Sequence, residues 1–299
     1  MLERMRARAA NERGVAAARD DRYADAVPHY LEAVRLAPSW CDPWFNLGIA
    51  YKHTGEFAAC LDACERAIAI DARGAGEGAH WNLGVAATAL GEWAKARRAW
   101  RAVGLTIPDG EGPIDLGRRS PTPVRLNPRS APEVVWATRI DPARARLDSV
   151  PLPASARRYG DPVLHDGEPQ GFRRLGGHEL PVFDELVLLE PSRYETWSTS
   201  VEAPRPEDVE DLRTRLRALD VPSEDWGEVR MLCEQCSLGV PHAHGGTRAD
   251  APPQGWTSAR AMGVAVRDVD PAPTLDAWAS AAPGRAVHGL ERVLRTRDA

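Results

Sequence analysis

Two cysteines and two histidines lie close together in the segment LCEQCSLGVPHAH, as Cys233, Cys236, His242 and His244. A Cys-x2-Cys turn can place two thiolates on one ion, and Zn²⁺ binds two sulfur and two nitrogen ligands in a tetrahedron. The four residues therefore predict a zinc site. Four protein ligands fill the coordination shell, which favours a structural metal over a catalytic one.

Alternatives to this four-ligand site stay open. Successive side chains of an extended chain alternate in direction, so one histidine, His242 or His244, could bind alone, with a further ligand from elsewhere. Cys233 and Cys236 could also be reduced, buried thiols beside exposed histidines, or a redox-active pair.

Other histidines and aspartates lie beside glycines, in the segments 165–167 (His-Asp-Gly) and 176–178 (Gly-Gly-His). Asp-Gly and Gly-Gly are typical of turns. Turn formation therefore explains both segments, and a catalytic role is not needed to explain them. The sequence contains no G-x-x-x-x-G-K-[ST] loop, no G-x-G-x-x-G after a strand and no H-E-x-x-H helix. It therefore predicts neither a nucleotide site nor a zinc-protease helix.

These residues belong to a chain of 299 residues with a formal net charge of −5. Its length indicates about two or three domains of roughly 150 residues each. No apolar run approaches the ~18 residues of a membrane span, and the polar start MLERMRARAANERG lacks the layout of a signal peptide. The five cysteines, an odd number, favour a reducing compartment. We expect a cytoplasmic protein with no membrane partner and, because it is acidic, no nucleic acid partner.

The first third of the chain contains three copies of one unit over about residues 7–109, offset by 34 and then by 36 residues. Four columns recur: the glycines Gly14, Gly48 and Gly84, the small residues Ala26, Cys60 and Ala96, the aromatics Tyr23, Phe57 and Trp93, and the larger Tyr30, Cys64 and Trp100. Small side chains let two helices approach closely, and turn signals at Asp20-Asp21, Gly55 and Gly91 separate the helices of each copy. The pattern therefore predicts three helix pairs.

These columns, with WFNLGIAY (44–51) and HWNLGVAA (80–87), resemble the tetratricopeptide repeat family over roughly a third of the chain. The resemblance implies a superhelix whose first helices line a concave groove for an extended peptide or a partner helix. Matching positions place in that groove Arg8, Asn11, Glu12, Arg19, Phe45, Asn46, Ile49, Lys52, His53, Trp81, Asn82 and Val85. The carboxylate clamp of chaperone-binding members is largely absent, because Val15 and Gly78 replace the expected Asn and Lys. We therefore expect no binding of a chaperone C-terminus.

A packing role stays open for two of these groove residues, Phe45 and Trp81. Three repeats without a polar final helix need an element that closes the stack, and later parts of the chain could cover both aromatics. The last helix carries Trp93 and Trp100, which favours docking of the following domain against it.

The rest of the chain predicts strands. Short strand-like runs separated by turns predict a small β-rich domain, a partly open barrel, over residues 110–190. Residues 191–299 follow the order β-α-β-β-α-β, which is the ferredoxin-like pattern. The predicted fold class is multi-domain α + β, with an N-terminal α-solenoid of three tetratricopeptide helix pairs (1–109), a β-rich domain (110–190) and a ferredoxin-like domain with the zinc loop (191–299).

These features predict a non-enzymatic adaptor that binds another protein or a peptide through the concave groove. A bacterial antitoxin or immunity protein is a specialised form of the same prediction. The alternative is a zinc-dependent hydrolase whose repeats position the substrate. It would use Cys233, Cys236 and one histidine as ligands, a water in the fourth position, and Glu234 or Asp225 as general base.

Overall fold

The computed structural model describes residues 2–70, 76–227 and 256–296. The chain divides into two compact units, of which the first comprises residues 1–118 with 140–143 and the second residues 119–139 with 144–299. The predicted zinc ligands Cys233, Cys236, His242 and His244 lie outside the described residues. None of the described helices is both long enough and apolar enough to cross a membrane.

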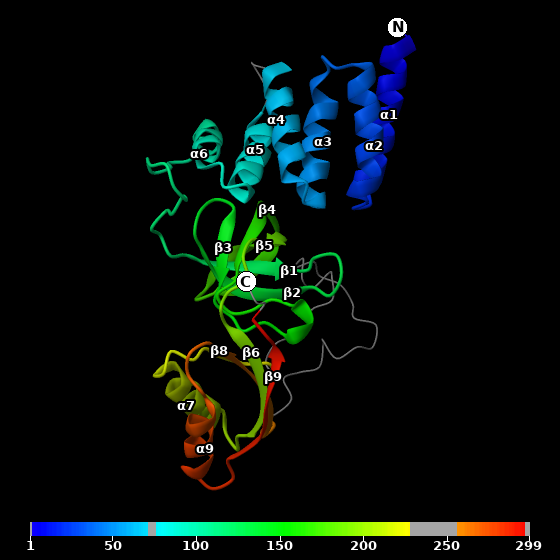
Figure 1. The fold of residues 1–299 in the computed structure, drawn as a ribbon. Helices are drawn as coiled ribbons and strands as arrows, with labels where there is room; N and C mark the ends of the chain where they lie inside the picture. The colour runs from blue at the N-terminus through cyan, green and yellow to red at the C-terminus, as the bar shows by residue number, and fades with distance from the viewer. Residues whose placement is uncertain (1, 71–75, 228–255, 297–299) are drawn as a thin grey trace. The chain divides into compact units, whose positions relative to one another are not determined.

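The first unit is a row of six helices that pack in sequence order (Figure 1). They are α1 (Leu2–Arg19), α2 (Tyr23–Leu36), α3 (Cys41–Thr54), α4 (Phe57–Ile70), α5 (Glu77–Ala89) and α6 (Trp93–Ala102). Each aromatic of the repeat column, Tyr23, Phe57 and Trp93, is the first residue of the second helix of its pair. The three helix pairs predicted from the repeat are therefore present.

The glycine column of the repeat meets the column of larger residues inside each pair. A Cβ atom placed on Gly14 would lie 2.5 Å from the ring of Tyr30, and one on Gly84 would lie 2.8 Å from the ring of Trp100. On Gly48 it would lie 2.8 Å from the sulfur of Cys64. Because real Cβ atoms need more room, the two helices of a pair reach this separation only with glycine at the crossing.

The turn inside each pair also repeats. Gly55 and Gly91 have φ values of 80° and 71°, and Asp21 takes the same left-handed conformation with φ 57°. This conformation ends a helix at little cost for glycine and at a higher cost for aspartate. The predicted turns at Asp20-Asp21, Gly55 and Gly91 are confirmed.

Arginines on α6 hold the segment that follows it. The guanidinium of Arg97 donates to the carbonyl of Pro108 at 3.1 Å, and that of Arg101 donates to the carbonyl of Ile107 at 2.9 Å. Trp100 is fully buried, and Trp93 is half-buried. Hence the residues after α6 fold back along the last helix of the array.

The second unit begins with five strands that close into a barrel in the order β1-β2-β3-β4-β5. They are β1 (Pro121–Leu126), β2 (Glu133–Arg139), β3 (Arg144–Leu147), β4 (Pro162–Leu175) and β5 (His178–Leu188), with a short 3-10 helix, η1, at Pro153–Ser155. Small and branched side chains fill the interior, among them Val124, Val135 and Leu147. The strand pattern predicts a partly open barrel, whereas the barrel is closed.

A parallel pairing of β1 with β5 closes the barrel. Arg125 lies opposite Asp184 in this register, and its guanidinium forms a bidentate ion pair with that carboxylate at 2.5 and 2.6 Å. Next to it, Glu185 accepts a hydrogen bond from the backbone N–H of Asn127 at 3.1 Å. These contacts join strands that are far apart in the sequence, which is why local strand patterns do not reveal the closure.

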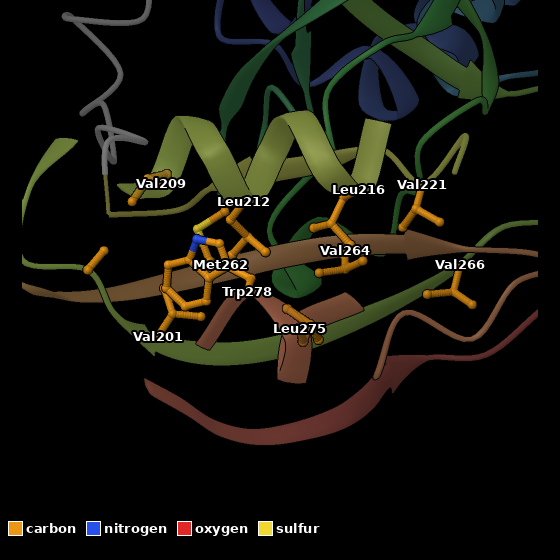
Figure 2. Packing of buried hydrophobic residues seen from close by; sticks show 11 residues of the cluster. Val201, Val209, Leu212, Leu216, Val221, Met262, Val264, Val266, Leu275 and Trp278 are labelled. Atoms are coloured by element: carbon orange, nitrogen blue, oxygen red, sulfur yellow. The ribbon is translucent and has the colours of Figure 1, made fainter. Parts of the chain in front are cut away.

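A four-stranded sheet with two helices follows the barrel. The elements are β6 (Glu195–Glu202), α7 (Pro206–Arg217), β7 (Ser223–Asp225), β8 (Ala259–Val266), α9 (Ala272–Ser280) and β9 (Ala286–Leu294). The sheet order is β7-β8-β6-β9, and every neighbouring pair is antiparallel. Figure 2 shows apolar side chains of α7 and α9 gathered against these strands, with Leu212, Trp278 and Met262 close together. On α7, Val209, Leu212 and Leu216 are buried, while Leu219 lies after the helix and is 40% exposed.

Two contacts tie this sheet to the barrel within the second unit. The indole N–H of Trp226 donates to the carbonyl of Val150 at 2.9 Å, and the guanidinium of Arg158 donates to the carbonyl of Arg295. Trp226 lies directly on Gly263 of β8, where an added Cβ would lie 2.3 Å from the indole. The glycine thus leaves the space that the indole occupies.

Candidate functional site

The predicted groove residues lie on α1, α3 and α5, the first helices of the three pairs. On α1, Arg8, Glu12 and Arg19 are exposed. On α3 and α5, Phe45, Asn46, Ile49, His53 and Trp81 are partly buried. These residues therefore offer side-chain surface to a ligand, and α1 offers the most.

The other four groove residues, Asn11, Lys52, Asn82 and Val85, are buried, and the first three form hydrogen bonds between repeats. The amide of Asn46 donates to Asn11 Oδ1 at 3.1 Å, which joins α3 to α1. The ammonium of Lys52 donates to Asn82 Oδ1 at 2.9 Å, which joins α3 to α5. Lys52 and Asn82 are 5% and 4% exposed, and Val85 is fully buried.

Because Asn11, Lys52, Asn82 and Val85 are buried, their side chains offer little or no surface to a partner in this structure. A buried ammonium needs a hydrogen-bonding partner inside the protein, and Asn82 supplies one. Lys52 and Asn82 join α3 to α5, and neither they nor the fully buried Val85 are available to a ligand in this structure.

Aromatic contacts fix further members of the set. The rings of Tyr23 and His53 stack with centroids 4.2 Å apart, and Trp81 meets Trp100 edge to face at 5.0 Å. Phe45 lies against Gly78, where an added Cβ would be 3.1 Å from its ring. Phe45 and Trp81 thus pack against other residues of the helical array, and both keep some exposed surface.

A surface cavity of about 650 Å³ lies at the start of the array and includes one predicted groove residue, Arg8. It is lined by Arg4, Met5, Arg8, Ala37, Ser39 and Trp40. We call this the α1 cavity. Arg4 and Arg8 are one turn apart on α1, so both side chains project from one face of the helix. Arg4 could have been identified from the sequence as a neighbour of Arg8, because it precedes Arg8 by four residues on the same helix. Nothing in the sequence indicates that the segment between α2 and α3 lines the same cavity.

The arginines of the α1 cavity are not engaged elsewhere in the described part of the chain. Neither Arg4 nor Arg8 forms an ion pair or side-chain hydrogen bond with residues 2–70, 76–227 or 256–296. Both are exposed, and the neighbouring Met5 is 63% exposed. The cavity thus combines two available guanidiniums with the apolar surface of a methionine and a tryptophan.

The metal prediction rests on residues outside the described ranges, and among the described residues no group of three or more His, Cys, Asp or Glu is arranged to hold an ion. One candidate base of the alternative hydrolase is described. Asp225 is 4% exposed and forms an ion pair with Arg260 at 2.6 Å, and it also accepts the backbone N–H of Gly227. In this structure the Asp225 carboxylate is therefore occupied by Arg260 and by a backbone N–H, and its prediction as a general base stays a prediction.

Of the two segments interpreted as turns, the one at Gly176-Gly177 is a turn, whereas 165–167 lies inside β4, where the pairing with β5 shifts register. Gly176 and Gly177, with φ values of 54° and 82°, form the two-residue turn between β4 and β5. His165 is fully buried, stacks on Phe183 with centroids 5.0 Å apart, and accepts the backbone N–H of Gly167 at Nδ1. These positions give no catalytic arrangement within the described ranges.

No protein-family model matches the chain, and no curated protein matches it either. Similar solved structures cover the helical third. The tetratricopeptide domain of Arabidopsis OM64 is 23% identical, with 34% of this chain and 82% of that chain covered and a TM-score of 0.32. The second such domain of human RPAP3, solved with the HSP70 peptide SGPTIEEVD, is 22% identical over 34% of this chain and 82% of that one, with a TM-score of 0.32. The N-terminal domain of STI-1 from C. elegans is 22% identical over 34% and 85%, again with a TM-score of 0.32.

The repeat register, the left-handed turns and the glycine crossings together define the class of the first unit. It is an array of three helix pairs whose repeat columns resemble those of the tetratricopeptide family. Each of these three structures covers about a third of this chain.

Proposed function

We propose that the helical array binds an acidic segment of another polypeptide, and that the α1 cavity is its anchor. The observation that carries this proposal is the pair Arg4 and Arg8, without ion-pair partners in the described residues, beside Met5 and Trp40. Guanidinium groups bind carboxylates through charge-assisted and often bidentate hydrogen bonds. The apolar neighbours fit a hydrophobic side chain next to the acidic one.

The rest of the contact runs along α1 and α3. Glu12 is exposed on α1, and Phe45 and Ile49 keep part of their surface on α3. Because Lys52, Asn82 and Val85 are buried, α5 contributes less to the surface than α1 does. A peptide would therefore engage the first two repeats, and the third repeat would mainly support them.

A displayed library of random peptides, selected on the full chain, tests this proposal. We expect the selected peptides to share an Asp or Glu next to an apolar residue, and to bind more weakly as salt increases, because exposed charge pairs are screened. Selected peptides without a shared acidic residue would contradict the proposal.

Variants of the cavity give the second half of the test. The Arg4→Glu/Arg8→Glu double variant should raise the dissociation constant of a selected, fluorescently labelled peptide at least about tenfold, as measured by fluorescence anisotropy. Arg66→Glu is the matched control, because Arg66 is an exposed arginine of α4 that does not line the cavity. Equal losses in the two variants would mean that the effect is one of net charge only.

The biological role that fits such a surface is that of a cytoplasmic adaptor that recruits another protein, and a bacterial antitoxin or immunity protein is one form of it. The β-α-β-β-α-β order and the sheet order β7-β8-β6-β9 support a ferredoxin-like assignment for the last module. Neither module after the array contributes a described catalytic arrangement, and we therefore favour recruitment over hydrolysis.

Zinc remains part of the proposal on the spacing of Cys233, Cys236, His242 and His244 alone. Metal content of the purified protein, measured for the wild type and for Cys233→Ser, tests it. We expect about one zinc per wild-type chain. The Cys233→Ser variant should lack the metal and should melt at a lower temperature than the wild type. A metal-free wild type of the same stability as the variant would exclude both the structural site and the zinc hydrolase.

A further inference from the structure

A second cavity, of about 320 Å³, lies within the second unit and belongs to none of the sites above. The barrel side contributes Asp148 and Tyr159, and α7 with the segment after it contributes Arg213, Arg217, Asp220 and Glu224. Its volume is at the lower end of the ~300–1,000 Å³ of small-molecule sites. The cavity therefore suits a ligand of few atoms, and we call it the α7 cavity.

Two arginines form the positive wall of the α7 cavity. Arg213 and Arg217 are one turn apart on α7, so they share a face of that helix. Each has Glu210 as an ion-pair partner, at 3.6 Å in both cases, a distance too long for a hydrogen bond. Both guanidiniums thus keep donors that a ligand can use.

Arg213 has a further, buried donor that is unsatisfied. Its Nε atom is inaccessible to solvent and has no hydrogen-bond partner within the described residues. A buried N–H without a partner costs free energy, and it is the other, accessible donors of the Arg213 guanidinium that can bind a carboxylate in the cavity.

Three carboxylates line the same cavity. Asp148 accepts the hydroxyl of Thr138 at 2.5 Å, and burial raises the pKa of Asp148 above its ordinary value despite that bond. Asp220 and Glu224 add two further carboxylates to the lining. A positive group in the cavity would favour the charged form of Asp148 and would offset this excess of negative charge.

We propose that the α7 cavity binds a small zwitterion of the α-amino acid type, with its carboxylate against Arg213 and Arg217 and its ammonium against Asp148 and Glu224. The argument is one of charge complementarity. A simple anion would meet three carboxylates, and a simple cation would leave the two guanidiniums unsatisfied. A zwitterion satisfies both walls at once, and its small size matches the volume.

This site is independent of the peptide site on the helical array. Its lining residues belong entirely to the second unit, whereas the α1 cavity belongs to the first. Failure of one proposal therefore leaves the other untouched, and the same preparation of the full chain serves both tests.

The first experiment is ligand-observed NMR of the full chain with the common L-amino acids, followed by calorimetric titration of the best one. We expect at least one amino acid to bind, and its N-acetyl derivative and its methyl ester each to bind at least about tenfold more weakly. The derivatives remove one charge each, so they test the two walls separately. Putrescine and succinate are the probes for a simple dication and a simple dianion.

The second experiment uses variants of the two walls. Arg213→Gln/Arg217→Gln should abolish binding of the amino acid, and Glu224→Gln should weaken it at least about tenfold. Arg215→Gln is the matched control on the same helix, because Arg215 pairs with Asp211 at 3.1 Å and does not line the cavity. Circular dichroism confirms that each variant is folded.

Several outcomes would overturn the proposal. These are no binding by any amino acid, unchanged binding in the folded double variant, equal binding of the acetylated or esterified derivative, or a preference for putrescine or succinate over every amino acid.

Discussion

Two ionisable residues buried at the barrel respond to pH in opposite directions. Glu133, the first residue of β2, accepts the backbone N–H of Leu152 at 3.1 Å with both carboxylate oxygens. Burial, with the charge of Glu224 nearby, raises the pKa of Glu133 to about 7. Burial, with the charge of Arg139, lowers the pKa of His165 to about 3.

The consequences for stability follow from proton linkage. Between its unfolded value near 4.5 and its folded pKa of about 7, Glu133 binds more protons in the folded state, so stability decreases as the pH rises through this window. His165 binds more protons in the unfolded state between pH 3 and 6.5, so stability decreases as the pH falls through that window. The two effects oppose each other where the windows overlap.

We therefore predict that Glu133→Gln stabilises the protein at neutral and higher pH. Glutamine is neutral at every pH and keeps an oxygen for the N–H of Leu152. The free energy of unfolding should exceed that of the wild type by at most about 3 kcal/mol above pH 7, and the difference should vanish below about pH 4.5. Urea denaturation across this pH range measures it.

The matched control is Glu168→Gln, because Glu168 is an exposed glutamate of β4. The free energy of unfolding of Glu168→Gln should differ little from that of the wild type, and the difference should not change between pH 4.5 and 7. The effect of His165 is common to the variants and cancels in each difference. A Glu133→Gln difference that is independent of pH would show that the side chain is not neutralised by burial.

The sequence alone could not single out these two residues. A glutamate at the start of a strand and a histidine in a His-Asp-Gly segment both look solvent-exposed or turn-forming. Their burial depends on the closure of the barrel, where Glu133 meets Leu152 across 19 residues and His165 meets Phe183. The burial of Lys52 also depends on a contact between distant residues, because its partner Asn82 lies on another repeat.

At the scale of elements, the glycine crossings decide how closely the helices of the array pack. We predict that Gly84→Ala destabilises the first unit by about 1–3 kcal/mol, because the new methyl group would overlap the fully buried ring of Trp100. Thermal unfolding followed by circular dichroism at 222 nm, where helices dominate the signal, measures this loss.

Gly112→Ala is the control for the same chemical change. An added Cβ at Gly112 meets no atom within 4 Å, and its φ is not in the left-handed region. Its melting temperature should therefore equal or slightly exceed that of the wild type. If the melting temperature of Gly84→Ala also equals that of the wild type, the ring of Trp100 can move aside and the α5–α6 crossing does not require glycine.

The elements also differ in how far the sequence predicts them. The helix pairs follow from a local repeat, because Gly84 and Trp100 or Gly14 and Tyr30 meet within one copy of the unit. The barrel and the α7 cavity arise from contacts between distant segments. The pairing of Arg125 with Asp184 spans 59 residues, and no short sequence pattern predicts it.

At the scale of the whole chain, the two units have separate hydrophobic cores. The core of the first includes Tyr30 and Leu47, and that of the sheet in the second includes Leu212 and Trp278. In the second unit, Asp208 of α7 is buried and forms an ion pair with Arg285 at 2.8 Å. Since each core can melt by itself, unfolding of the full chain need not be a single two-state transition.

We predict that calorimetry of the full chain resolves two transitions that respond to different variants. Gly84→Ala should lower only the transition of the helical array. Asp208→Asn should lower only the other one, by about 1–3 kcal/mol, because it removes one of the two carboxylates that pair with the buried guanidinium of Arg285 and leaves Asp211. A shift of both transitions in both variants would show that the units unfold as one cooperative block, and binding at the array would then be linked energetically to the α7 cavity.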